Sequence, residues 1–139
     1  MSGVWGPSKF FTPKVTNTIT FVDTPAAAQT IFTVTGDVIV KIIPVCTTDV
    51  TSGAAANVRL GIVGSDQAMI ADTVATEIDA REIWHDAAPD SEIEALSVAR
   101  EYIITDGNNV ILTPDGQVDT GVIVFYCDWS PLSADGNVV

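Results

Sequence analysis

The only histidine of the chain, His85, lies in the run Ile83-Trp84-His85-Asp86. A histidine next to an aspartate could activate a serine nucleophile, but such a relay also needs a suitably placed serine. The sequence has no Gly-x-Ser-x-Gly turn to present one and no P-loop to hold a phosphate. A histidine at the end of a strand, beside an aromatic residue, is the simpler interpretation. We therefore predict no catalytic residue, no cofactor and no enzyme activity.

Residues that bind metals are present but poorly arranged. Zinc sites use several cysteines and histidines, whereas this chain offers one histidine and two cysteines, Cys46 and Cys127, that lie far apart in the sequence. Eleven of the 18 acidic residues lie between Asp66 and Asp106, yet they lack the spacing of an EF-hand calcium loop. A charged stretch of this kind is typical of a solvated face, and the sequence predicts no metal site.

A second acidic pair, Asp115 and Asp119, forms a two-carboxylate loop. Such a loop could hold a calcium ion weakly, but its Asp-Gly step is also typical of a tight turn, and we predict the turn. Cys46 and Cys127 each end a strongly apolar segment, where a free thiol behaves as a small hydrophobic side chain. We therefore expect both thiols to be buried and unpaired, in a reducing compartment.

The composition of the whole chain favours an all-β fold. Of its 139 residues, 18 are Val, 14 are Ile and 16 are Thr, and β-branched side chains suit a strand better than a helix. This length is enough for one core but short for two. A net charge of -12 argues against nucleic acids and anionic membrane surfaces as partners. The sequence shows no secretory signal and no apolar run of membrane-spanning length, so we expect synthesis in a cytoplasm.

Alternation of apolar and polar residues marks the clearest strands. Residues 32–42 alternate at a period of two, and Gly36-Asp37 is expected to split this run into two strands. Residues 57–63 repeat the alternation, which predicts one face on a core and one in water. In the last long segment, residues 118–126, both faces are apolar from Val122 onward, which predicts a central or covered strand.

Two further segments need a choice between alternatives. Residues 91–101 could form a short helix, with Ser91 and Glu94 as a capping box, or a strand, and the neighbouring strands favour a strand. Residues 102–113 are typical of a hairpin around Asp106-Gly-Asn-Asn, and Pro114-Asp-Gly supplies the next turn. Seven to nine short strands predict an antiparallel β-sandwich or jelly-roll-like barrel, formed by residues 15–139 as a single β domain.

Residues 1–14 are predicted to form an N-terminal arm. Its glycines and prolines interrupt regular structure, whereas three aromatic residues, Trp5, Phe10 and Phe11, are unusual in a disordered tail. Docking of these rings would explain both features. The surface that receives them could belong to the same domain or to a neighbouring subunit.

The run Asp119-Thr-Gly-Val-Ile-Val-Phe-Tyr-Cys-Asp-Trp-Ser-Pro-Leu-Ser resembles the closing strand and tail of small β-rich virion proteins of tailed bacteriophages. The stretches Gly36-Asp-Val-Ile-Val-Lys-Ile and Ala56-Asn-Val-Arg-Leu-Gly-Ile resemble earlier strands of the same proteins. The resemblance implies a structural role in the virion, as a capsid-decorating or minor head subunit made in the host cytoplasm. It also implies a symmetric oligomer, with a trimer favoured, and no catalysis.

On this interpretation the partners are further copies of the chain and the major capsid protein or another virion protein. The residues expected at these interfaces are aromatic or apolar, because such residues dominate interface hot spots: Trp5, Phe10, Phe11, Trp129, Pro131 and Leu132. Burial of each within its own subunit is the alternative. The alternative function is a carbohydrate- or receptor-binding module of a phage fibre or tail, with Trp84 and Trp129 as a sugar-stacking platform.

Overall fold

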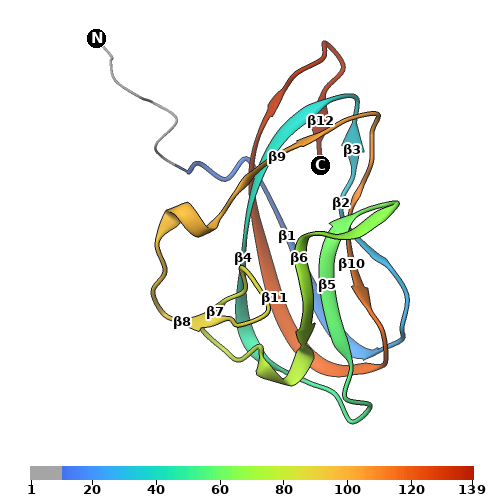
Figure 1. The fold of residues 1–139 in the computed structure, drawn as a ribbon, viewed down its shortest axis with the longest axis vertical. Coiled ribbons are helices and arrows are strands. Elements are labelled where there is room, and N and C mark those ends of the chain that lie inside the picture. The colour runs from blue at the N-terminus through green and yellow to red at the C-terminus, as the bar shows by residue number, and fades with distance from the viewer. Residues whose placement is uncertain (1–10) are drawn as a thin grey trace.

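The computed structural model describes residues 11–139, which form strands and two short 3-10 helices (Figure 1). The strands are β1 (Val15–Thr24), β2 (Gln29–Phe32), β3 (Val34–Thr35), β4 (Val38–Thr51), β5 (Asn57–Ile62), β6 (Ser65–Val74), β7 (Glu82–Ile83), β8 (Asp90–Ser91), β9 (Glu101–Ile104), β10 (Val110–Pro114), β11 (Val118–Pro131) and β12 (Asn137–Val138). The helices are η2 (Ala75–Glu77) and η3 (Leu96–Val98). Neither helix in this part of the chain is long and apolar enough to cross a membrane. The all-β prediction is confirmed.

Two antiparallel sheets pack against each other. The larger sheet has the strand order β1-β11-β4-β7-β8, with β9 also paired to β4, and the smaller sheet has the order β2-β10-β5-β6. The chain crosses between the sheets from β1 to β2, from β4 to β5 and from β10 to β11, which is the arrangement of a double-sheet jelly roll. Across residues 11–139 the sheets remain separate. The predicted antiparallel sandwich is therefore confirmed, with a jelly-roll strand order, and the described residues form no closed barrel.

The core lies between the sheets and follows the alternation seen in the sequence. Five side chains of the alternating segment 32–42 are buried there: Phe32, Val34, Val38, Val40 and Ile42. Gly36 has a φ of 63° and separates β3 from β4, so the predicted split of this segment is confirmed. In β5, Val58 and Leu60 are buried in the same core.

Strand β11 lies between β1 and β4, so the prediction of a central strand is confirmed. Its register against β4 slips around Gly121, whose φ of 133° favours glycine. Beyond the slip, Ile123 and Phe125 are buried in the core. Val122 and Val124 alternate with them, so they lie on the opposite face of the sheet and are only half-buried.

The predicted hairpin of residues 102–113 is wrong. Strand β9 pairs with β4 in the larger sheet, whereas β10 pairs with β2 and β5 in the smaller sheet. Asp106 and Gly107, with φ values of 60° and 66°, turn the chain from one sheet to the other. A glycine-containing turn signals a reversal of direction, but the same residues serve whether the two strands pair or separate into different layers.

The predicted strand of residues 91–101 is also wrong. The chain is extended in β8 and again from Glu101, and between them it is irregular apart from η3. The helix alternative fails at its cap, because the N-cap of η3 is Ala95 and not Ser91. Glu94, the second member of the expected capping box, contacts His85 instead. A tertiary contact has therefore overridden the local pattern.

Candidate functional site

Residues 84–100, which we call the strap, connect β7 to β9 along the side of the sandwich where β4 and β6 lie (Figure 1). Trp84 anchors the start of the strap. Its side chain is fully buried, its indole N–H donates to the hydroxyl of Thr73 over 2.8 Å, and its ring meets Phe125 edge to face. Its backbone N–H donates to the carbonyl of Pro44 over 3.0 Å. Because His85 directly follows this anchor, core packing fixes the position from which its ring extends.

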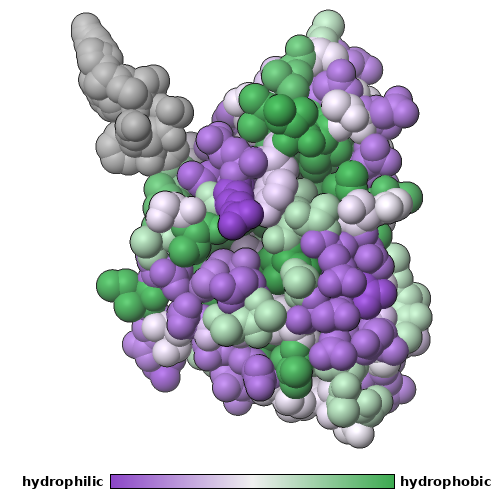
Figure 2. All heavy atoms as spheres, in the orientation of Figure 1, coloured by the Kyte–Doolittle hydropathy of each residue, from purple (hydrophilic) through white to green (hydrophobic). Residues whose placement is uncertain are grey.

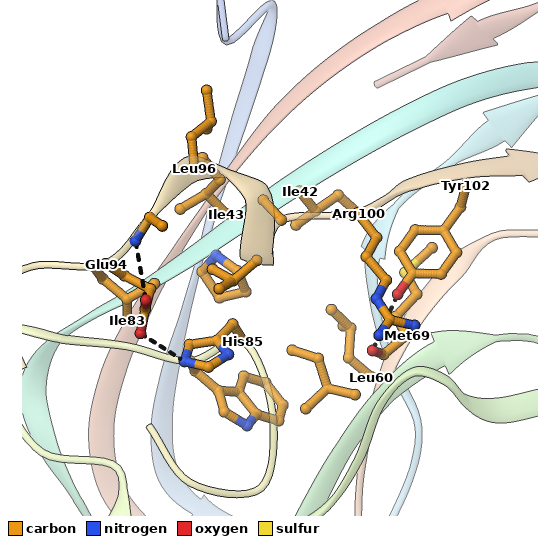
Figure 3. Close-up of a pocket in the computed structure, with 16 residues that line it drawn as sticks. Ile42, Ile43, Leu60, Met69, Ile83, His85, Glu94, Leu96, Arg100 and Tyr102 are labelled. Carbon is orange, nitrogen blue, oxygen red and sulfur yellow. Dashed lines mark hydrogen bonds and ion pairs between the residues drawn. The ribbon is translucent and has the colours of Figure 1, made fainter. Parts of the chain in front are cut away.

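A pocket of about 180 Å³ lies beneath the strap (Figure 3). Much of its lining is apolar and comes from β4, β5 and β6, with Ile42, Leu60 and Met69 among the contributors. Tyr102 closes one side, where its hydroxyl donates to the carbonyl of Met69 over 3.2 Å, and burial raises the pKa of this tyrosine. The other polar side chains of the lining are His85, Glu94 and Arg100.

Three carboxylates surround the imidazole of His85. Nε2 lies 2.9 Å from Oδ2 of Asp90 and 3.1 Å from Oε2 of Glu94. On the other side of the ring, Nδ1 lies 3.3 Å from Oδ2 of Asp86. The His85 side chain is only 13% exposed, so these carboxylates take the place of most of its water. The cluster joins the end of β7 to β8 and to the middle of the strap.

The two carboxylates on the Nε2 side differ in how they are held. The backbone N–H of Ala95 donates to Oε1 of Glu94 over 2.9 Å, which leaves Oε2 directed at His85 (Figure 3). Asp90 is more exposed. Hydrogen bonds with His85 and then with Glu94 lower the pKa of Asp90, which favours its ionised form. An ionised carboxylate at this distance from an imidazole nitrogen is able to accept its proton or to share a cation with it.

The predicted sugar-stacking platform is not formed. Trp84 is fully buried and presents no face to a sugar. Trp129 is half-buried and packs against the core. The ammonium group of Lys14 lies 5.9 Å from the centroid of the Trp129 ring and donates to its backbone carbonyl over 2.6 Å. The two tryptophans therefore serve packing.

The predicted interface residues fall into three groups. Trp5 and Phe10 lie outside the described residues. Phe11 and Trp129 are half-buried within their own subunit. Pro131 and Leu132 are exposed at the end of β11 and just beyond it, with Leu132 exposed by 53%.

The acidic loop of Asp115 and Asp119 is used for local structure. The backbone N–H of Asn57 donates to Asp115 over 2.7 Å, and the N–H of Gly53 donates to Asp119 over 2.8 Å. The bond from Asn57 lowers the pKa of Asp115, and bonds from Gln117 and then Gly53 lower the pKa of Asp119. Both carboxylates therefore tie the loop between β4 and β5 to the turn that the sequence predicted.

The sequence singled out His85 but not the carboxylates that meet it. The available signal was a lone histidine in the middle of the acidic stretch from Asp66 to Asp106, with the spacing His85-x4-Asp90-x3-Glu94. Carboxylates at such spacings are common on solvated surfaces, and only the irregular path of the strap brings these together. Comparisons of the chain with models of protein families, with curated proteins and with solved structures found no match.

Proposed function

We propose that this protein is a structural subunit of a virion, of the capsid-decorating or minor head type, that assembles with further copies of itself. The observation that carries the proposal is the apolar character of the larger sheet on the side away from the core. An antiparallel sheet commonly covers the core with one face and presents polar side chains to water on the other. In this protein the middle of the outward side of the central strands β4 and β11 is apolar, and polar or charged residues flank it on both strands.

The outer face, as we call it, consists of five half-buried side chains: Ile43, Val45, Val122, Val124 and Tyr126. The strand register places Ile43 opposite Tyr126 and Val45 opposite Val124, so these residues are cross-strand neighbours. Ile83 of β7 extends the face beyond Val45. A contiguous apolar strip of half-buried side chains supports the proposed interaction site.

Apolar side chains continue toward one end of the same sheet. Ile103 of β9 pairs with Ile39 of β4 and is 69% exposed. Figure 2 shows hydrophobic atoms gathered over the end of the molecule where β4 and β9 lie, next to largely hydrophilic surface. Exposed Leu132 follows β11, the strand that pairs with this part of β4. The candidate interface therefore includes Leu132, one of the interface residues predicted from the sequence.

Charge favours a second copy as the occupant of the outer face. Each chain carries a net charge of -12, so two copies repel each other in most orientations. The outer face carries no carboxylate, and the next outward charged residues along the central strands, Lys41 and Asp128, oppose each other in register. Two copies can therefore meet here with little repulsion while burying aliphatic surface. Closed symmetry limits such an assembly, and a trimer is the order we favour.

Two weaker arguments support the virion role. Jelly rolls occur in viral capsid proteins, although the same fold serves other functions. The run from Asp119 along β11 resembles the closing strand of phage virion proteins. We assign attachment to the major capsid protein, or to another virion protein, to the N-terminal arm. The burial of Trp84 weakens the carbohydrate-binding alternative.

Substitution of Val124 by Glu tests the assembly. The charge falls in the middle of the outer face, and we expect Val124→Glu to reduce the oligomer to a monomer in size-exclusion chromatography with light scattering. Val63→Glu is the matched control, because Val63 is 55% exposed directly after β5 in the smaller sheet; this variant should keep the wild-type mass. A monomeric wild type, or an oligomer that survives Val124→Glu, would contradict the proposed interface.

The virion role is tested separately, through the genes on either side. A gene for a major capsid protein or a head protease next to this one supports the role. A neighbourhood of metabolic genes contradicts it, even if the chain forms an oligomer.

A further inference from the structure

The cluster around His85 holds more acceptor atoms than hydrogens to satisfy them. Oδ2 of Asp90 and Oε2 of Glu94 lie 2.9 and 3.1 Å from the same atom, Nε2. A histidine nitrogen carries at most one hydrogen, so it can donate fully to only one of the two oxygens. The ligand atoms of all three residues lie within 4.8 Å of one another. Two carboxylates this close repel each other unless a cation or a proton lies between them.

The distances from Nε2 in the cluster are close to those between the ligands of a bound metal ion. Zinc binds an imidazole nitrogen at about 2.0–2.1 Å and a carboxylate oxygen at about 2.0–2.2 Å, which separates neighbouring ligand atoms of a tetrahedral site by about 3.3–3.5 Å. The separations from Nε2 to the oxygens of Asp90 and Glu94 are 2.9 and 3.1 Å. An ion can therefore be placed between these atoms with only small side-chain movements.

The other nitrogen of His85 provides an independent argument. A metal-binding histidine usually donates its second ring N–H to a carboxylate or carbonyl, which fixes the tautomer and the orientation of the ring. Asp86 occupies this position, with Oδ2 3.3 Å from Nδ1. The backbone N–H of Ala88 donates to Oδ1 of Asp86 over 2.7 Å and so holds this carboxylate in place. In the tautomer that carries its hydrogen on Nδ1, on the side of Asp86, the lone pair of Nε2 is directed toward Asp90 and Glu94.

We propose that His85, Asp90 and Glu94 bind one divalent transition-metal ion that cross-links three positions within the strap. A mixed set of imidazole and carboxylate ligands suits Zn²⁺, whereas Ca²⁺ and Mg²⁺ take oxygen ligands. The N–H of Ala95 binds Oε1 of Glu94, which leaves Oε2 directed into the cluster, 3.1 Å from Nε2 of His85. The ion links three points of the strap, namely its start just after β7, its strand β8 and the residues before η3. Its role is structural, since it holds together the part of the strap that borders the pocket.

The experiment is a calorimetric titration of Zn²⁺ into the full, untagged chain after removal of metal with a chelator. We expect one Zn²⁺ per chain. Glu94→Gln and Asp90→Asn keep the size of each side chain but remove its charge, and each should weaken Zn²⁺ binding at least tenfold. Glu92→Gln is the matched control. It removes the same charge from the same segment, but its carboxylate faces Arg81 at 3.8 Å, so this variant should bind Zn²⁺ like the wild type.

Two further readouts separate a built site from an acidic surface that attracts cations. Zn²⁺ should raise the melting temperature of the wild type and of Glu92→Gln, but not that of Glu94→Gln. Co²⁺ should give visible absorption bands with the wild type that Glu94→Gln loses. If circular dichroism shows that Glu94→Gln disturbs folding, the Zn²⁺ affinity and melting temperature of Asp90→Asn are used in its place, because Asp90 is exposed. The proposal is overturned if Zn²⁺ binding does not saturate, if all three variants bind Zn²⁺ alike, or if Ca²⁺ binds as tightly as Zn²⁺.

Discussion

Cys46 on β4 and Cys127 on β11 carry free thiols buried in the core, which confirms the prediction from their apolar surroundings. Burial raises the pKa of Cys46 to about 11 and that of Cys127 to about 12. Because the thiolate is the reactive form, both residues should be inert at neutral pH. We expect the native protein at about pH 8 to react with a disulfide reagent far more slowly than the unfolded protein, in which both thiols react at once.

The same pKa values fix the sign of a pH effect on stability. The thiols of the unfolded chain lose their protons near pH 8.5, whereas those of the folded chain keep them to about pH 11. Above about pH 8.5 the unfolded state therefore binds fewer protons, and the free energy of unfolding falls as the pH rises. Fast labelling of two thiols in the native protein at neutral pH would contradict this account.

At the scale of single residues, the sequence predicted some members of the candidate site but not others. His85 stood out as the single histidine, and the turn role of Asp115 and Asp119 followed from their Asp-Gly step. The partners of His85 did not stand out, because Asp90 and Glu94 belong to a stretch that has neither helical nor strand geometry. Periodicity reports which side chains share a face of a regular element, and it carries no information where the backbone is irregular.

At the scale of elements, the slip in register at Gly121 predicts that this position of β11 tolerates only glycine. A side chain there is disfavoured twice, because φ is 133° and an added Cβ would lie 2.8 Å from the Cα of Val50. Gly64, between β5 and β6, has a φ of 89° but open space around its Cα. Both alanine variants incur a backbone cost of about 1–2 kcal/mol. Only Gly121→Ala adds a clash, which costs a further 1–3 kcal/mol or so.

Urea denaturation of Gly121→Ala and Gly64→Ala measures this difference directly. We expect Gly121→Ala to lose clearly more unfolding free energy than Gly64→Ala. Equal losses in the two variants would mean that β11 can shift away from β4 at this point, and that the slip in register is not held by close packing.

The sequence predicted where several strands lie but not which strands pair with each other. The strands of residues 32–42 and 57–63 were visible because their alternation reflects one buried face. The partner of each strand was not visible. Strand β9 pairs with β4, more than 50 residues earlier in the chain, rather than with the adjacent β10. Local turn residues fix the reversal of the chain, whereas pairing depends on which layer buries each strand, and that is a property of the whole sandwich.

On the scale of the whole molecule, charge and apolar surface are divided between regions. Eleven of the 18 acidic residues lie between Asp66 and Asp106, the part of the chain that includes the strap. The outer face of the larger sheet is aliphatic by contrast, with threonines of β1 beside β11. This division fits the proposed assembly, because one region keeps its charges in water while the other offers apolar surface to a partner.

This division predicts the sign of a salt effect on assembly. Subunits of charge -12 repel each other over a distance set by screening, which shrinks from about 30 Å at 0.01 M salt to about 8 Å at 0.15 M. The proposed interface offers no ion pairs between copies for salt to weaken. Added sodium chloride should therefore strengthen association, measured as a lower dissociation constant in sedimentation experiments over a dilution series.

Val124→Glu should remain a monomer at every salt concentration in the same series, because the introduced carboxylate is desolvated when the outer face is covered. An oligomer that dissociates as salt rises would point instead to an interface of opposite charges, for which the acidic strap and the few basic residues of the chain are the available surfaces. The direction of the salt effect thus distinguishes assembly through the outer face from assembly through the strap.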